Sequence, residues 1–384
     1  MSGIFGDISV EEFLRDYWQK KPLLIRQAFP GFESPISQDE LAGLACETDT
    51  SRIVIEKGGK YPWEVRHGAF DDDDFTNLPE THWTLLVNDT DQYLPELKAI
   101  MEPFRFIPDW RIDDLMISFA VEGGSVGPHV DEYDVFLIQA QGQRRWQINT
   151  DPVKPDNFLP DLELRIMRDF KVGEEWIVEP GDMLYLPPNI PHYGVALNEC
   201  MTYSVGFRAP SQADMLERLV EDLLEQPRLK QRFSDAGRSL QTNPGELAET
   251  DIDRLVDFVA DALPQDTHAL QMWLGKYLSE PKAGNNPLEP EDISKSKLEK
   301  FIKAKKSFAK TANCRFLYLL AGSDLCLFAN GSQHTLPPAS LGFVQMLCKN
   351  DVFKHTDYKI HITDKECFET LHELLCTGLI YIVE

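Results

Sequence analysis

The sequence lacks several features that mark special classes of protein. It has no apolar run approaching the ~20 residues that a membrane-spanning helix needs. Its first residues carry neither a basic stretch nor an apolar run, so a secretory leader is not expected. The seven cysteines are odd in number and show no close-paired metal-binding spacing. These absences predict a cytoplasmic protein whose thiols stay reduced.

Basic residues are scarce as well. The 38 Lys and Arg residues face 63 Asp and Glu residues, which gives a formal net charge of −25. Residues 289–384 contain equal numbers of the two kinds, so the whole excess of negative charge lies in residues 1–288. An acidic body repels nucleic acid phosphates and attracts basic partners. The alternative explanation is that the charge serves solubility alone.

Short strands separated by Gly and Pro turns run from about residue 114 to 208, a pattern typical of a β-sandwich or barrel. Helical periodicity follows, at 211–225, 228–234, 247–263 and 268–278. A Pro- and Asn-rich segment then precedes a small α+β unit. We therefore expect an α+β protein whose divisions are a barrel with N-terminal helices over 1–210, a helical region over 211–280, a linker over 281–291 and the small unit over 292–384.

Three polar residues predict a metal site in the barrel. His129 and Asp131 are two residues apart, so their side chains can share one strand face, and they follow a glycine loop. His192 comes after Glu179-Pro-Gly-Asp-Met-Leu-Tyr-Leu-Pro-Pro-Asn-Ile-Pro. Two imidazoles and one carboxylate form the facial triad that holds Fe(II) and leaves positions open. This spacing fits a double-stranded β-helix (cupin) barrel, although zinc or manganese would also suit the ligands.

Arg144 follows on the return strand of a predicted hairpin. Alternation places Arg144, Trp146 and Ile148 on one strand face, with Arg145 and Gln147 on the other. An inward guanidinium needs a partner, and a dicarboxylate co-substrate would supply one. The alternatives are an exposed strand arginine or a structural ion pair. The side chains of Ser118 and Thr202 could complete the carboxylate's hydrogen bonds, or could be routine barrel hydroxyls.

Four runs of sequence resemble the bacterial ribosomal oxygenases, which belong to the Jumonji-C branch of the 2-oxoglutarate- and Fe(II)-dependent oxygenases. The resemblance covers essentially the whole chain and is tightest from about residue 108 to 210. It implies a Jumonji-C barrel, then a helical dimerisation region and a winged-helix-like domain at the C-terminus. The runs are Pro108-Asp-Trp-Arg-Ile-Asp-Asp-Leu-Met-Ile-Ser-Phe, Gly127-Pro-His-Val-Asp-Glu-Tyr-Asp-Val-Phe, Glu179-Pro-Gly-Asp-Met-Leu-Tyr-Leu-Pro-Pro and Tyr203-Ser-Val-Gly-Phe-Arg-Ala-Pro.

The resemblance also implies an activity. It assigns Fe(II) to His129, Asp131 and His192, and it pairs Arg144 with the distal carboxylate of 2-oxoglutarate, with molecular oxygen as co-substrate. Ser118 and Thr202 would assist, although the family can carry Asn at the latter position. The expected reaction is hydroxylation of an arginine side chain in a basic large-subunit ribosomal protein by a homodimeric enzyme. Carboxylates that would hold the arginine are Asp113, Asp114 and Asp134, each of which could equally be a turn or capping residue.

Two other functions remain open at this point. One is a metal-dependent cupin enzyme that does not use 2-oxoglutarate, in which Arg144 would hardly matter. The other is a non-catalytic binding module whose C-terminal unit contacts DNA. Residues 295–310 contain seven lysines and one Glu, which would suit phosphates, but a solvated helix face would look the same. Because the C-terminal unit is neutral overall, DNA binding is not expected.

Overall fold

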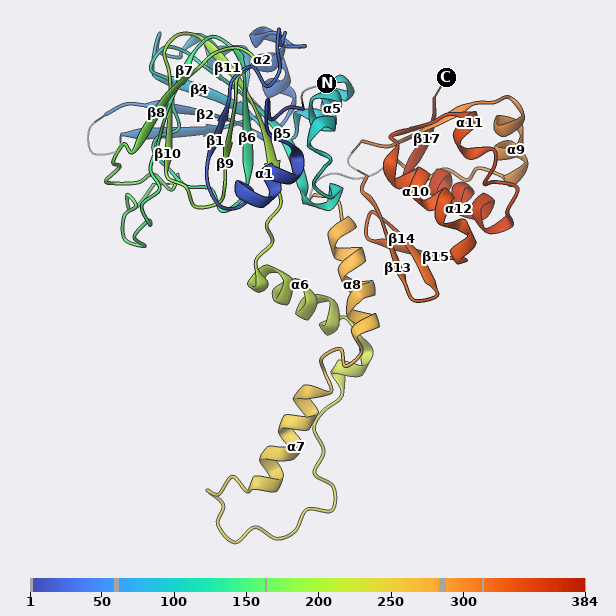
Figure 1. Ribbon diagram of the computed structural model, residues 1–384. Coiled ribbons are helices and arrows are strands. Elements are labelled where there is room, and N and C mark those ends of the chain that lie inside the picture. The colour runs from blue at the N-terminus through green and yellow to red at the C-terminus, as the bar shows by residue number, and fades with distance from the viewer. Residues whose placement is uncertain (1–2, 59–61, 163, 283–287, 313, 384) are drawn as a thin grey trace. The chain divides into compact units, whose positions relative to one another are not determined.

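Antiparallel sheets dominate the first of the two units into which the chain divides, residues 1–209 and 210–384 (Figure 1). The computed structural model describes residues 3–58, 62–162, 164–282, 288–312 and 314–383. In the part of the chain so described, no helix is long and apolar enough to cross a membrane.

Two sheets face each other in the first unit and form the expected barrel. The larger has eight strands in the order β1-β9-β6-β11-β5-β4-β2-β3, and the smaller has the order β10-β7-β8. All pairings are antiparallel. The strands are β1 Leu23–Ile25, β2 Ser51–Glu56, β3 Trp63–His67, β4 Trp83–Val87, β5 Ile112–Ala120, β6 Val135–Gln141, β7 Arg144–Ile148, β8 Glu174–Val178, β9 Met183–Leu186, β10 His192–Ala196 and β11 Cys200–Phe207.

The large sheet is buried on both faces, which strand β6 illustrates. Phe136 and Ile138 point to one face and join a core shared with the N-terminal helices. Val135 and Leu137 point to the other face and pack against Trp146 of the small sheet. Because successive side chains alternate, a strand covered on both sides is apolar throughout. The helices of this unit are α1 Val10–Asp16, α2 Gln38–Glu47, α3 Asp72–Thr76, α4 Thr90–Tyr93 and α5 Lys98–Met101, with 3-10 turns at Pro95–Leu97, Glu102–Phe104 and Asp109–Arg111.

The second unit begins with helices. Three α-helices form where periodicity predicts them, but the helix expected over 228–234 is wrong, since only the 3-10 turn Pro227–Lys230 is present. That turn has no side-chain cap, so little supports a longer helix there. Of the expected linker, residues 283–287 lie outside the described residues. The helices are α6 Gln212–Leu224, α7 Glu249–Ala260 and α8 Thr267–Ser279.

The remainder of the second unit is a small α+β arrangement with its own core. Two three-stranded sheets, β16-β12-β17 and β13-β14-β15, surround helices that bury Phe343, Leu347 and Leu371. Helix α8 packs directly on β14, since a Cβ at Gly275 would lie 2.3 Å from the Phe328 ring. The elements are α9 Lys295–Lys303, β12 Ser307–Lys310, β13 Phe316–Ala321, β14 Asp324–Ala329, β15 Ser332–Leu336, α10 Leu341–Lys349, β16 Val352–Phe353, α11 His355–Tyr358, α12 Lys365–Cys376 and β17 Ile380–Val383, with a 3-10 turn at Pro338–Ser340.

Candidate metal centre

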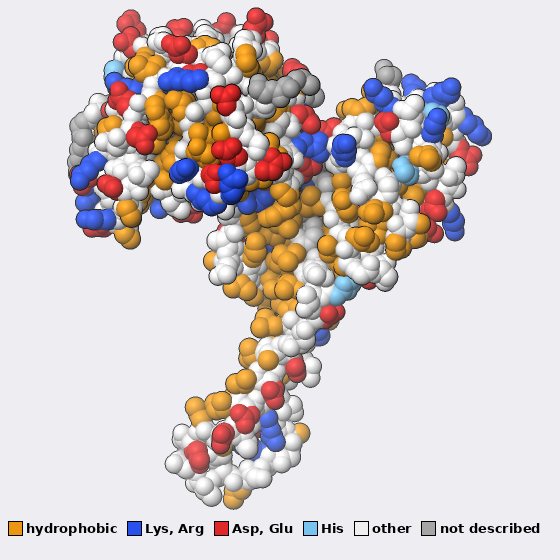
Figure 2. All heavy atoms as spheres, viewed as in Figure 1, with side chains coloured by type: hydrophobic (Ala, Val, Ile, Leu, Met, Phe, Trp, Pro, Cys, Tyr) orange, Lys and Arg blue, Asp and Glu red, His pale blue; other side chains and the backbone are white. Residues whose placement is uncertain are grey.

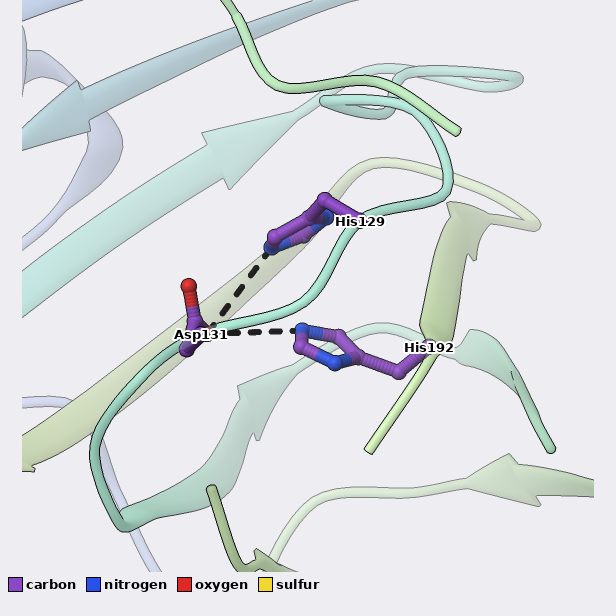
Figure 3. A group of neighbouring side chains, drawn as sticks. All are labelled: His129, Asp131 and His192. Carbon is purple, nitrogen blue, oxygen red and sulfur yellow. Dashed lines mark ion pairs between the residues drawn. The ribbon is translucent and has the colours of Figure 1, made fainter. Parts of the chain in front are cut away.

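The barrel brings His129, Asp131 and His192 together, although the last is 61 positions along the chain from Asp131. His129 lies between β5 and β6, and His192 is the first residue of β10. The two histidines are opposite one another in an isolated antiparallel bridge, and each backbone N–H donates to the other's carbonyl at 3.0 Å. Asp131 follows two residues after His129, so the three side chains converge (Figure 3).

The three side chains offer their ligand atoms to one small volume. Oδ2 of Asp131 lies 3.5 Å from Nε2 of His192 and 3.9 Å from Nε2 of His129. All three ligand atoms lie within 4.8 Å of one another. The His192 side chain is buried, whereas those of His129 and Asp131 are each 23% exposed. The group is therefore accessible from one side, as a site that must admit a substrate requires.

Hydrogen bonds at the far ring nitrogens fix the state of both imidazoles. Nδ1 of His129 lies 2.9 Å from the Gly127 carbonyl, and Nδ1 of His192 lies 2.8 Å from the Ile190 carbonyl. A carbonyl can only accept, so Nδ1 carries a proton in each ring, and Nε2 is the atom that faces the shared volume. This arrangement suits metal binding, because ligating histidines commonly use the second nitrogen in this way.

Burial favours the neutral, metal-binding form of His192. Burial, and to a smaller extent the neighbouring His129, lowers the pKa of this imidazole to about 4, although the Asp131 carboxylate acts in the opposite direction. The ring is therefore neutral at pH 7. Two nitrogens and one carboxylate oxygen on one side of the site fit Fe(II) with positions left for other ligands.

Arg144 lies on β7 with its side chain directed into the barrel. Residues 144, 146 and 148 are buried and residues 145 and 147 are half-buried, which is the alternation that the sequence predicts. Nε of Arg144 is buried without a hydrogen-bond partner in the described part of the chain, and the guanidinium lies 5.5 Å from the Trp146 ring centroid. A buried cation in this state is costly unless an anion joins it.

Ser118 and Thr202 are cross-strand neighbours on β5 and β11. The Ser118 hydroxyl donates to the Thr202 carbonyl at 3.5 Å, and the Thr202 hydroxyl donates to Oε1 of Gln139 at 3.1 Å. All three residues are buried. By strand alternation they occupy the face of the large sheet that looks toward β7. Gln139 was not predicted from the sequence, because only the pairing of β6 with β11 reveals that it adjoins Thr202.

The register of β7 and β10 separates the arginine from the metal ligands. His192 pairs with Ile148, whereas Ala196 pairs with Arg144. Four residues of strand span about 13 Å. Ala196 also packs with Ala120 and Cys200, which lie two residues from Ser118 and Thr202 on the same strand faces. The cation and the two hydroxyls therefore gather at one end of the barrel interior, and the three ligands at the other.

The candidate carboxylates are engaged in different ways. Asp134 is fully buried and accepts hydrogen bonds from Tyr185 at 2.6 Å and Arg111 at 3.2 Å. Asp113 forms an ion pair with Arg208 at 3.0 Å. Asp114 accepts the backbone N–H of Asp89. The tight contacts of Asp134 give it a structural role.

Tyr133, two residues beyond Asp131, was not predicted from the sequence. The residue is 43% exposed, yet burial around its hydroxyl raises the pKa of Tyr133. The carboxylates of Asp131 and Asp114 raise it further. The Tyr133 hydroxyl is therefore close enough to the carboxylates of Asp131 and Asp114 to be influenced by both. Its place two residues after a ligand is the one signal in the sequence that could have drawn attention to it.

Comparisons with known proteins agree with this architecture. Residues 99–215 match the JmjC domain, and residues 262–381 match the ROXA-like winged helix. The chain is 38% identical over 289 residues to the ribosomal protein uL16 3-hydroxylase of Escherichia coli, an alignment that covers 73% of this chain and 76% of that protein. It is 37% identical over 263 residues to a probable ribosomal oxygenase of Haemophilus influenzae, covering 67% of this chain and 64% of the relative.

Solved structures extend the similarity over the whole chain. The X-ray structure of E. coli YcfD superposes with a TM-score of 0.85 at 32% identity, covering 98% of this chain and 99% of that one. The ribosomal oxygenase YcfD in complex with cobalt and 2-oxoglutarate gives a TM-score of 0.82 at 32% identity, with the same coverage. The predicted Jumonji-C barrel and C-terminal winged helix are thus confirmed. The chain belongs to the JmjC-type ribosomal oxygenases, a family of 2-oxoglutarate-dependent dioxygenases.

Proposed function

We propose that this enzyme hydroxylates an arginine side chain of a large-subunit ribosomal protein, with Fe(II) held by His129, Asp131 and His192. The observation that carries the proposal is the combination of this three-ligand group with the buried guanidinium of Arg144 in one barrel. A relative named for hydroxylating ribosomal protein uL16 supports the substrate class. The net charge of −25 also favours a basic protein over nucleic acid.

Arg144 is the residue that we assign to 2-oxoglutarate. A dicarboxylate would supply the anion that the buried guanidinium needs, through a charge-assisted contact. The hydroxyls of Ser118 and Thr202 are at the same end of the barrel and would donate to that carboxylate by rotating away from their present acceptors, the Thr202 carbonyl and Oε1 of Gln139. The separation of about 13 Å along β7 and β10 leaves room for an extended arginine side chain and a five-carbon acid. A YcfD structure with cobalt and 2-oxoglutarate, at 32% identity, supports this assignment.

The reaction divides between the bound groups and the protein. When bound, Fe(II) activates oxygen so that one atom enters a substrate C–H bond and the other enters the succinate formed from 2-oxoglutarate with loss of carbon dioxide. The chain's own share is orientation: Arg144 fixes one end of the co-substrate, and the hydrogen bonds at Nδ1 of the two histidines keep Nε2 directed at the metal position. The apolar walls of Leu137, Trp146 and Leu184 exclude water from the interior.

Tyr133 and Asp114 are the groups that we propose to receive the substrate guanidinium. An aromatic face and a carboxylate together suit a planar cation, one through its π-system and the other through hydrogen bonds. Tyr133 adjoins the metal ligand Asp131, so a guanidinium held there would place its alkyl chain near the metal position.

The test is mass spectrometry of basic ribosomal proteins after incubation with the enzyme, Fe(II) and 2-oxoglutarate. We expect one protein to gain the mass of an oxygen atom, and fragmentation to locate it on an arginine. The gain should vanish with His129→Ala. Hydroxylation of a histidine instead would contradict the arginine assignment, and no gain on any ribosomal protein would contradict the substrate class.

The helical region of the second unit supports a homodimer as the working form. Leu216, Val220 and Leu224 form an exposed apolar stripe at four-residue spacing on α6. Helix α7 carries another, including Ile252, Val256 and Val259, and none of its twelve residues is buried (Figure 2). An isolated helix of this length is marginal in water. A second copy that covers these stripes would stabilise it.

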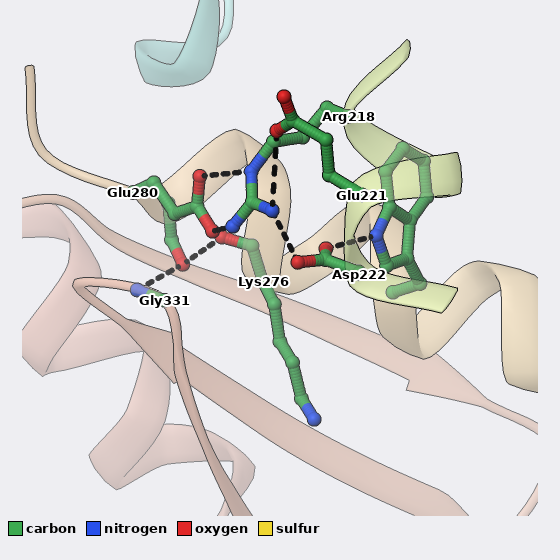
Figure 4. Close-up of polar contacts among 8 residues, drawn as sticks. Arg218, Glu221, Asp222, Lys276, Glu280 and Gly331 are labelled. Carbon is green, nitrogen blue, oxygen red and sulfur yellow. Dashed lines mark hydrogen bonds and ion pairs between the residues drawn. The ribbon is translucent and has the colours of Figure 1, made fainter. Parts of the chain in front are cut away.

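Helix α6 is fixed to α8 by polar contacts, so its stripe has a defined position within this unit (Figure 4). Arg218 bridges Asp222 of its own helix and Glu280 beyond the end of α8, and Trp273 of α8 donates to Asp222 at 2.8 Å. Light scattering should therefore give the mass of two chains. The double variant Val220→Lys, Val256→Lys should give one chain, while Ile360→Lys, at a position 71% exposed in the winged-helix part, should leave two. A single chain for the wild type would contradict the proposal.

A further inference from the structure

The two histidines of the metal centre make the same kind of hydrogen bond to the turn that precedes each of them. Each imidazole is bonded at Nδ1 to the carbonyl two residues earlier in its own chain, Gly127 for His129 and Ile190 for His192. Each turn contains a residue with positive φ, which is Gly127 itself (+81°) in one and Asn189 (+62°) in the other. The positive φ belongs to the carbonyl-bearing residue in the first turn and to the residue just before it in the second.

The turn at Asn189 also reaches the third ligand. Its backbone N–H donates to the Asp131 carbonyl at 2.7 Å. After the bridge of His129 with His192, a continued antiparallel ladder would join Asp131 to Ile190. The amide of Asn189 takes that place instead, one residue out of register. The Ile190 carbonyl is thereby available to the His192 ring. One turn therefore contacts two ligands that come from different segments of the chain.

We infer that Asn189 is a positioning residue for the metal centre, acting through its left-handed backbone rather than its side chain. The residue is exposed, and no hydrogen bond joins its side chain to any residue that the structure describes. Asn is among the few residues that adopt this conformation readily, whereas a β-branched residue there is strained. Relaxing that strain would turn the Ile190 carbonyl and the Asn189 amide away from His192 and Asp131 together.

The inference rests on the proposed metal site. Measurements of cobalt binding can distinguish a failure of the positioning role from a failure of the metal site itself. We expect Asn189→Val to weaken Co(II) binding by about tenfold or more. Metal affinity typically falls by this amount when a group that hydrogen-bonds to a metal ligand is removed. Asn189→Gly should bind within about twofold of the wild type, because glycine accepts positive φ. The readout is the visible absorbance of bound Co(II), titrated at equilibrium, and it needs no turnover.

A matched control is available in the other unit. Asn330, in the turn between β14 and β15, also has positive φ (+47°), so Asn330→Val carries a similar backbone penalty away from the ligands, together with loss of the hydrogen bond that its side chain accepts from the Arg315 N–H. It should lower the unfolding temperature but leave the Co(II) affinity unchanged. Should Asn189→Val fail to fold, the milder Asn189→Ala takes its place against Asn189→Gly.

Three results would overturn the inference. Wild-type affinity in the valine and alanine variants of Asn189 would show that the turn does not orient the ligands. Equal weakening by Asn330→Val would show that general destabilisation is the cause. Cobalt that binds the His129→Ala variant as tightly as the wild type would remove the proposed metal site itself, and the positioning role with it.

Discussion

Ala196, and not His192, is the cross-strand partner of Arg144. This register places the guanidinium four residues away from the level of the metal ligands, where it is buried and its Nε has no partner among the described residues. A buried cation without a paired anion is costly for the fold, and this cost is what we expect of a residue that binds a carboxylate.

Replacing Arg144 with Met should therefore abolish the binding of 2-oxoglutarate without lowering the stability of the ligand-free fold. We expect the free energy of unfolding without ligands to stay the same or rise, since exchanging a buried charge for an apolar side chain is often neutral or stabilising. With metal present, 2-oxoglutarate at a hundred times its Kd should stabilise the wild type by about 2.7 kcal/mol and the variant not at all. Denaturant unfolding measures both. Arg145→Met, on the opposite strand face, is the control and should keep the response; a response in Arg144→Met would exclude the co-substrate role.

Gly194 provides a second test, because it lies beside the metal centre. A Cβ at this position would come within 2.6 Å of the Trp146 ring, whose centroid is 5.8 Å from that of His192. Gly194→Ala should cost about 1–3 kcal/mol of stability through overpacking, and should weaken metal binding as Trp146 shifts. The control is Gly43→Ala, at an exposed site in α2 where a Cβ meets nothing, which should stabilise by up to about 1 kcal/mol. Similar unfolding free energies for the two variants would contradict the packing argument.

The sequence could predict those parts of this centre that depend on residues close together in the chain, but not those that depend on residues far apart in it. His129 and Asp131 share a short motif, and the alternation of residues 144–148 shows which face of β7 is inward, so both are visible in local pattern. Gln139 beside Thr202 and the bridge between His129 and His192 depend on strand register, which a single sequence does not encode locally. Strand β10, whose first residue is His192, was not predicted either, because glycine and proline interrupt the apolar pattern around it.

The buried state of His192 predicts a pH dependence for the metal-free enzyme. In the unfolded chain this imidazole takes up a proton near pH 6.5, but in the folded barrel only at about 4. Between these values the unfolded state binds more protons, so the free energy of unfolding must fall as the pH falls. His192→Gln removes the effect. Urea unfolding in the presence of a chelator should show the wild type losing stability relative to the variant from pH 6.5 to about 4, and parallel curves would contradict the prediction.

Loss of charge should affect different properties at Asp134 and Asp114: the stability of the fold at Asp134, and the binding of substrate at Asp114. Asp134→Asn removes the charge of a fully buried carboxylate that pairs with the partly exposed Arg111, so it should cost up to about 3–5 kcal/mol of stability. Asp114→Asn keeps an oxygen that can accept the Asp89 N–H, so the fold should persist, while KM for a basic peptide substrate should rise by roughly 10–100-fold with loss of a charged hydrogen bond of about 1.5–3 kcal/mol. Tyr133→Leu should raise the same KM, because it removes the aromatic face but keeps apolar bulk. If Asp114→Asn lowers kcat while KM is unchanged, the carboxylate does not hold the substrate guanidinium, and Asp113 becomes the residue to test.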